Sequence, residues 1–210
     1  MAVVTVSRQY GAGGQRVAAA LAESLGFRVA DRDVVEAAAR QLGMAPEVAE
    51  GRDERTPALI EELCMVLAAA SPEFAHAPPA TRLDDRTLAE ATGRVITSLA
   101  GVGGYVILGR GGQAALRDRT DVCHLHLVGD PSDRARRIAK WQGIDEQAAA
   151  ERCRKVDAER AAYVKRFYGV DLTDPLLYHA VLNTTRLGLG GATNAALSVA
   201  RSALGLEATS

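Results

Sequence analysis

The chain has 210 residues, a mass of 22.1 kDa and a formal net charge of -1 at pH 7. This length predicts one domain, and hydrophobic and charged contents of 48% and 24% exclude a disordered or collagen-like chain. The near-neutral charge gives no general attraction to nucleic acid or anionic lipid. No uncharged apolar run approaches the roughly 20 residues that span a bilayer, so we expect no nucleic-acid or membrane partner.

The cysteines and the N-terminus point to a reducing compartment. Cys64, Cys123 and Cys153 are odd in number and lack the C-x-x-C spacing, which favours reduced thiols over a disulfide framework or a zinc site. The first six residues have no basic start of the kind that a secretory signal carries. We therefore expect a cytoplasmic protein that binds something small; a homo-oligomer is compatible with these features.

Buried strands alternate with helices along the chain. Continuous apolar or β-branched runs predict strands over residues 2–6, 27–30, 105–108, 123–128 and 181–185. Helical patterns cover residues 17–25, 31–42, 57–70, 85–99, 131–166 with a break near Gly143, and 194–204. We expect Gly101 to end the fourth helix, Pro131 to open the fifth, and residues 43–57 and 71–79 to form loops. This alternation predicts an α/β sandwich around a parallel sheet.

A glycine-rich turn, Ser7–Arg16, follows the first strand. A strand, a glycine turn and a helix N-terminus together make an anion site, because backbone N–H groups and the helix dipole point at it. A tight connection without a ligand is the alternative, but three glycines among residues 11–14 exceed what a simple turn needs.

Neither common glycine motif fits this turn. The dinucleotide fingerprint fails because Arg16 stands where its third glycine belongs. The phosphate-loop motif G-x-x-x-x-G-K-[ST] also fails. With Gly13 as its second glycine, Arg8, Gly14 and Gln15 replace glycine, lysine and hydroxyl. A phosphate cradle without lysine needs its positive charge from elsewhere.

Residues 134–166 offer that charge, since they hold ten of the 25 basic residues against five acidic ones. Arg134 and Arg137 share a helix face, and Arg154, Asp157 and Arg160 repeat at intervals of three. A solvated helix face is the alternative. Arginine, however, suits planar, bidentate recognition of phosphate.

Two further candidates follow buried strands. Arg110 lies between Gly109 and Gly111 at the C-terminal end of the third strand, the edge at which parallel sheets bind ligands. It is a candidate anion-binding residue, with a structural strand cap as the alternative. Asp31–Arg32 after the second strand is a weaker candidate, because Asp31 is also a good N-cap. His124 and His126 have no partners at metal-ligand spacing and are read as packing residues.

These motifs resemble the cytidylate kinase-like family, in the nucleoside monophosphate kinase branch of P-loop proteins, over essentially the whole chain. The matching segments are Ser7–Gly14, Asp31–Arg32, Gly109–Gly111, Asp133–Arg134 with Arg137, Glu159–Tyr163, Asp174–Pro175 with Tyr178, and Asn183–Thr184. The resemblance implies a three-layer sandwich around a five-stranded parallel sheet in the order 2-3-1-4-5. It also implies an acceptor-side helical insertion at about residues 43–85 and a lid at about residues 140–170.

The resemblance further implies the reactants and the site. ATP with Mg²⁺ would be the donor, and no protein metal ligand is expected. The donor-binding residues would be Arg8, Gly11, Ala12, Gly13, Gly14, Gln15, Arg16, Arg134 and Arg137. Arg110 would grip the acceptor phosphate, with Arg154 and Arg160 supplying bridging charge as the other catalytic residues. Asp31, Arg32 and Asp157 would complete the acceptor site.

The expected activity is phosphoryl transfer from ATP to a small acceptor, namely a nucleoside monophosphate such as CMP. The chain departs from cytidylate kinases at Gly14, at Gln15 and at Gly111, where their motif has aspartate. Two alternatives stay open: a nucleotide-binding module without catalysis, and a kinase for a different small metabolite.

Overall fold

The computed structural model describes residues 2–31 and 85–206. Residues 32–84 lie outside the described ranges, and they hold Arg32, Cys64, nearly all of the helices expected over 31–42 and 57–70, the loops expected over 43–57 and 71–79, and nearly all of the expected insertion at 43–85.

A five-stranded, fully parallel sheet forms the centre of the described structure. Its strands are β1 (Val3–Arg8), β2 (Arg28–Ala30), β3 (Tyr105–Leu108), β4 (Val122–Val128) and β5 (Ala180–Asn183). They lie in the order β2-β3-β1-β4-β5, which confirms the expected order. Because β1 is central and pairs with both β3 and β4, the glycine turn that follows β1 lies beside the ends of both neighbours.

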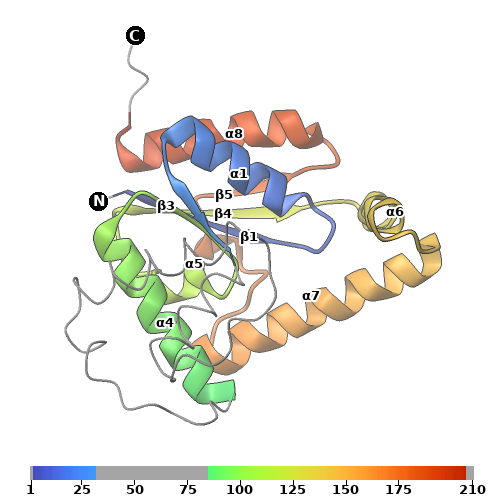
Figure 1. Ribbon diagram of the computed structural model, residues 1–210, viewed down its shortest axis with the longest axis horizontal. Coiled ribbons are helices and arrows are strands. Elements are labelled where there is room, and N and C mark those ends of the chain that lie inside the picture. The colour runs from blue at the N-terminus through green and yellow to red at the C-terminus, as the bar shows by residue number, and fades with distance from the viewer. Residues whose placement is uncertain (1, 32–84, 207–210) are drawn as a thin grey trace, which may run out of the picture.

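Helices cover both faces of the sheet and give three layers (Figure 1). The helices are α1 (Gly14–Leu25), α4 (Asp85–Val102), α5 (Gly112–Ala115), α6 (Pro131–Gln142), α7 (Glu146–Tyr168) and α8 (Gly188–Leu204), with a short 3₁₀ turn η2 (Pro175–Leu177). α1 and α8 lie on one face, and α4, α5 and α7 lie on the other (Figure 1). No helix among the described residues is long and apolar enough to cross a membrane.

Alternation along β1 builds a core on each face of the sheet. Val4 and Val6 pack with α1 and α8, whereas Val3 packs with α4 on the opposite face. Successive side chains of a strand point to opposite faces, so an unbroken apolar run is what a doubly covered strand requires. The position of the loop after β1 is therefore set by a strand buried on both sides.

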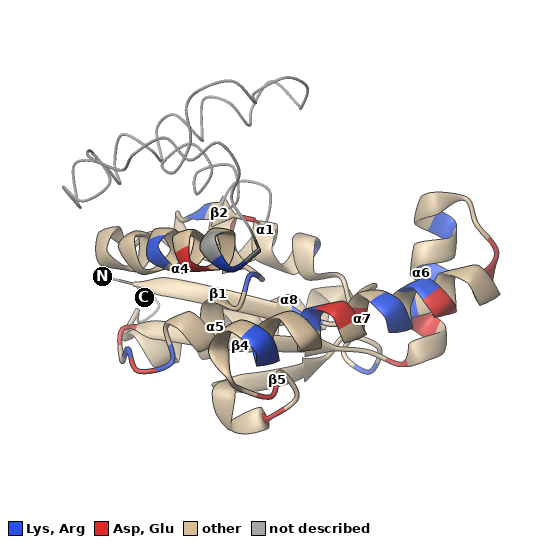
Figure 2. Ribbon diagram, turned by 90° about the horizontal axis from the view of Figure 1, so that it is seen from below, with Lys and Arg blue, Asp and Glu red and all other residues tan. Residues whose placement is uncertain are grey.

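α6 and α7 pack against each other and form an arm at one end of the sheet, in which basic and acidic residues are interspersed (Figure 2). α6 begins as expected at Pro131, and the side chain of Asp130 accepts a hydrogen bond from the N–H of Ser132. Gly143, with φ +67°, ends α6. Apolar side chains from both helices make a small core of their own, formed by Ala135, Ile138, Ala149 and Cys153.

Several element boundaries differ from expectation. β1 continues to Arg8 instead of ending at Val6, because Ser7 and Arg8 still pair with β4. α4 passes through Gly101 and stops at Val102, since the left-handed residue that ends it is Gly103, with φ +79°. α8 begins at Gly188 rather than Asn194, because packing against α1 outweighs the poor helix propensity of its early glycines. The short helix α5 was not expected at all.

Candidate phosphate-binding site

The turn between β1 and α1, hereafter the glycine loop (residues 9–13), has the geometry of an anion cradle. Gly11 and Gly13 have φ of +80° and +81°, a region that favours glycine, and Gly13 is the N-cap of α1. Such turns direct successive N–H groups to one side, and the first N–H groups of α1 have no partner within the helix. A Cβ at Gly13 would collide with the side chain of Leu189, so the start of α8 covers one side of the loop.

Three arginines of the α6–α7 arm donate to the carbonyl oxygens of this region. Arg160 Nη1 donates to the carbonyl of Arg8 at 3.0 Å, and Arg134 Nη1 donates to that of Tyr10 at 3.0 Å. Arg137 Nη1 donates to the carbonyl of Gly11 at 3.3 Å. The arm thus fixes the shape of the glycine loop and places positive charge against its carbonyl side.

Asp157 on α7 joins the arm to the loop. One carboxylate oxygen accepts from the N–H of Tyr10 at 2.6 Å, and the other accepts from Arg134 Nη1, also at 2.6 Å. Arg134 is 6% exposed and donates its Nε–H to the carbonyl of Gly129. The Arg160 guanidinium lies over the Tyr10 ring, 5.5 Å from its centroid. Asp157 therefore holds Arg134 and the loop backbone together, and its assignment to the acceptor stays a prediction.

Other predicted donor residues lie around the loop in different environments. Gln15 and Arg16 are exposed on the first turn of α1. Ala12 is buried in the core under α1, so only its backbone can face a ligand. Arg154 is exposed on α7, and no contact recorded among the described residues joins it to the glycine loop.

Arg110 lies in a left-handed turn at the end of β3. Gly109, Arg110 and Gly111 have φ of +85°, +53° and +70°, and Arg110 is the one non-glycine residue with positive φ in the described ranges. The N–H of Gly112 donates to the carbonyl of Gly109 at 3.0 Å and closes the turn. A bulky residue in this region is strained, and such strain concentrates at functional sites.

Aromatic residues from the end of α7 hold the Arg110 turn, and sequence reasoning gave them no role. The Arg110 guanidinium lies over the Tyr163 ring, 5.1 Å from its centroid, and Tyr168 Oη donates to the Arg110 carbonyl at 3.4 Å. Burial raises the pKa of Tyr168 well above its ordinary value. In the sequence, Tyr163 belongs to the Glu159–Tyr163 segment that carries the family resemblance, and this was the one indication that it has a role. α7 thus contacts both the glycine loop and the Arg110 turn.

The remaining candidates lie on neighbouring strands. Asp31 is half-buried directly after β2, which is next to β3. His124 and His126 are buried on β4, where His124 Nδ1 is 2.7 Å from Thr5 Oγ1 and His126 stacks on Tyr178. Burial lowers the pKa of each histidine to about 4. Both rings are packed in the interior, as the sequence predicted, and their lowered pKa favours the neutral form at pH 7.

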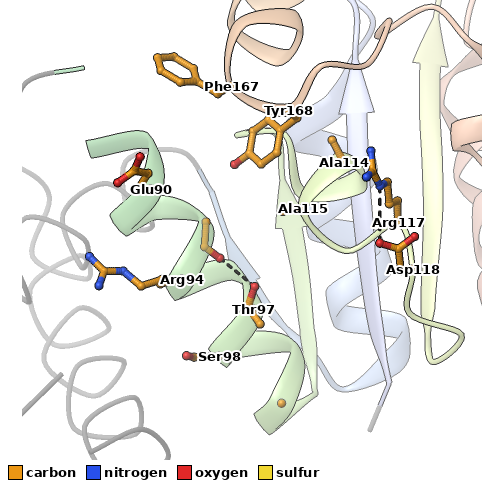
Figure 3. Close-up of a pocket in the computed structure, with 12 residues that line it drawn as sticks. Glu90, Arg94, Thr97, Ser98, Ala114, Ala115, Arg117, Asp118, Phe167 and Tyr168 are labelled. Carbon is orange, nitrogen blue, oxygen red and sulfur yellow. Dashed lines mark hydrogen bonds and ion pairs between the residues drawn. The ribbon is translucent and has the colours of Figure 1, made fainter. Parts of the chain in front are cut away.

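Two cavities adjoin these elements. One of about 520 Å³ opens beside the glycine loop and is lined by residues that include Gln9, Gly129, Arg134, Asn183, Thr185 and Arg186. The other, of about 980 Å³, lies between α4, α5 and the end of α7, and Figure 3 shows Tyr168 at one end of it and Thr97 and Ser98 on α4. The first adjoins the loop itself, so it is the space available to the rest of a ligand whose phosphates the loop holds.

The chemistry of the glycine loop suits the phosphate groups of a ligand. The loop presents backbone donors and a helix N-terminus to phosphate, with arginines behind it. No cluster of three or more His, Cys, Asp or Glu side chains suited to a metal ion occurs among the described residues. Magnesium in nucleotide sites is commonly held by phosphate oxygens, waters and one or two protein groups. The residues present therefore suit Mg²⁺ that arrives with the nucleotide.

Comparison with solved structures agrees on the architecture. An uncharacterized protein from Eubacterium ventriosum has a TM-score of 0.70 at 19% identity, over 96% of this chain and 99% of that one. The shikimate kinase from Bacteroides thetaiotaomicron has a TM-score of 0.50 at 10% identity, over 97% and 98% of the two chains. The sheet order and these neighbours define a P-loop fold like that of the nucleoside monophosphate kinases.

Comparison of sequences gives the family. A model described as the cytidylate kinase-like family matches residues 3–186. The chain belongs to this family. A cytidylate kinase from Methanopyrus kandleri is 43% identical over 53 residues, which is 25% of this chain and only 28% of the length of that curated relative.

Proposed function

We propose that this protein transfers the terminal phosphoryl group of ATP to a nucleoside monophosphate, with CMP as the first acceptor to test. Family and fold support a kinase-like, nucleotide-binding enzyme. The observation that carries the proposal is that two left-handed, glycine-containing turns follow adjacent strands of the sheet. The glycine loop follows β1 and the Arg110 turn follows β3, which are neighbours in the sheet.

In the proposed reaction each turn would bind a different substrate. Loop N–H groups and the α1 N-terminus would hold the donor phosphates, while Arg110 would hold the acceptor phosphate. Bound Mg²⁺ would neutralise charge on the donor phosphates. Such transfer depends on positioning and charge stabilisation more than on covalent chemistry, so it suits a site built from backbone and arginine.

The α6–α7 arm would act as a lid over these groups. It reaches the glycine loop through Arg134, Arg137, Asp157 and Arg160, and reaches the Arg110 turn through Tyr163. Its closure around substrates would exclude water and limit ATP hydrolysis. The lid residues would be about 140–170, as the resemblance implies.

Coupled ATP turnover over a panel of nucleoside monophosphates tests the proposal. We expect turnover with at least one member, with ADP as the second product. ATP binding without turnover would favour the catalytically inactive module, which the absent lysine and hydroxyl at Gly14 and Gln15 support. Turnover with another small metabolite, but with none of the panel, would favour a kinase for that metabolite.

Replacing Arg110 tests the acceptor assignment. A charge-assisted contact to phosphate contributes about 1.5–3 kcal/mol, so Arg110→Ala should lower kcat/KM for the acceptor by roughly one to two decades. Arg110→Lys should recover only part of that loss, because lysine lacks the planar fork. Donor KM should change little in both variants. A large loss of thermal stability with intact acceptor kinetics would show instead that Arg110 is a structural strand cap.

A further inference from the structure

The glycine loop contains an exchange of residue types relative to the phosphate-loop motif. The motif has glycine at its first position and lysine immediately after its second glycine. In this chain the first position is Arg8 and the later one is Gly14, so a cation and a glycine have traded places. From the sequence alone, Gly14 at this position indicates only that the lysine of the motif is missing.

The structure shows that the two exchanged residues occupy one space. A Cβ built on Gly14 would lie 2.8 Å from Arg8 Cγ and 3.2 Å from its Cδ. The aliphatic stem of Arg8 therefore covers Gly14 and fills the volume where a side chain at the lysine position would begin. Arg8 reaches this place because β1 extends to residue 8, which leaves its side chain at the start of α1.

The charged end of Arg8 lies at the second anion-binding turn. A Cβ built on Gly109 would collide with Arg8 Nη1, with the guanidinium carbon 3.2 Å away. Gly109 immediately precedes Arg110. The Arg8 guanidinium is thus situated between the N-terminus of α1 and the Arg110 turn, where the donor and acceptor phosphates would meet.

The other arginines at the loop are arranged differently. Arg134, Arg137 and Arg160 come from the α6–α7 arm and donate to backbone carbonyls of residues 8–11, so they hold the backbone of the loop. Arg8 instead comes from the loop's own strand and extends across the first residue of α1. We propose that Arg8 is the phosphate-contacting cation of this loop and takes the place of the missing lysine.

This inference rests on the proposed function and gives Arg8 a role in its transfer step. In that step the bond between the terminal phosphorus and the bridging oxygen of ATP breaks, and ADP leaves with the electron pair. A new bond forms between that phosphorus and an oxygen of the acceptor phosphate. Arg8 neither gains nor loses a proton, because its guanidinium stays charged; it stabilises the charge on the oxygens of the transferred group.

Three variants test the exchange. Arg8→Gln keeps the stem over Gly14 and removes the charge, so it should weaken binding of a non-hydrolysable ATP analogue at least tenfold and lower kcat about 10²-fold. Gly14→Lys alone should weaken analogue binding and lower kcat by similar factors, because the lysine side chain would collide with Arg8 Cγ. The double variant Arg8→Gly/Gly14→Lys restores the standard order and should bind the analogue at least tenfold more tightly than Arg8→Gln or Gly14→Lys.

Arg117→Ala is the matched control, since it removes an exposed arginine that pairs with Asp118 away from the glycine loop, and it should bind the analogue like the wild type. Thermal unfolding of every variant checks that it is folded. If Arg8→Gln does not fold, Arg8→Lys, which keeps a charge, replaces it. The affinity of Arg8→Lys for the analogue should lie between those of the wild type and of Gly14→Lys. The inference would be overturned if Arg8→Gln bound the analogue with an affinity within twofold of the wild type. It would also be overturned if the double variant bound the analogue no more tightly than Arg8→Gln and Gly14→Lys.

Calorimetric binding of the analogue does not depend on the acceptor. Absence of turnover with every acceptor would therefore count against the proposed function alone, and the effect of Arg8 on analogue affinity would still decide this inference.

Discussion

Removing the Asp157 carboxylate should destabilise the protein through the buried Arg134. Loss of one partner of a buried ion pair costs about 3–5 kcal/mol, because a buried charge is left uncompensated. The Asp157 side chain is 25% exposed and that of Arg134 is 7% exposed, and Arg134 keeps its bonds to the carbonyls of Gly129 and Tyr10. We therefore expect Asp157→Ala to lower the free energy of unfolding by about 2–3 kcal/mol.

Urea unfolding followed by circular dichroism measures this loss. Glu90→Ala is the control, because Glu90 pairs with Arg86 on the exposed surface of α4, and it should cost no more than about 1 kcal/mol. Combining Asp157→Ala with Arg134→Met in a double-mutant cycle should give a coupling energy of at least about 1 kcal/mol. If Asp157→Ala cost no more than the control while raising the acceptor KM, Asp157 would be a substrate contact, and its structural role would be refuted.

Three further outcomes are expected. Gly13→Val should weaken ATP binding at least tenfold and lower thermal stability, because its φ is +81° and its side chain meets Leu189; unchanged affinity, measured by calorimetry on folded protein, would contradict the loop assignment. Hydrogen exchange of residues 141–168 should slow when an ATP analogue binds, and equal protection in both states would exclude a lid. The depressed pKa values of His124 and His126, about 4 against 6.5, mean that the unfolded chain binds protons first as pH falls. Stability should therefore be full above about pH 6.5 and fall by roughly 2 kcal/mol per histidine between pH 7 and 5. Urea unfolding at each pH should show that His126→Gln removes about half of that slope, and a flat profile in the wild type would show that the rings are not buried as neutral groups.

The sequence alone predicted the strands of the described sheet and most of its helices, though not α5. The continuous run of β-branched residues at 3–6 is typical of a strand that is covered on both faces of a sheet. Glycine at positions 11 and 13 allows the positive φ that this turn requires and that other residues rarely adopt. Pro131 predicted the start of α6 because the fixed φ of proline suits the first position of a helix. These properties are local, so they can be read from neighbouring residues. The order of the strands, by contrast, came from the family resemblance.

Only the tertiary structure decided what the charged side chains contact. Periodicity places Arg134 and Arg137 on one helix face, but it does not say that this face meets the carbonyl oxygens of the glycine loop. Likewise the sequence showed that Gly14 replaces lysine, and only the packing showed that the Arg8 stem fills the space over it. The direction of a long side chain is set by residues distant in the chain, because burial and hydrogen bonding select one rotamer among many. For this reason the sequence predicted an anion site at the glycine loop, and the fold determined which arginines contact the loop backbone and which one lies between the loop and the Arg110 turn.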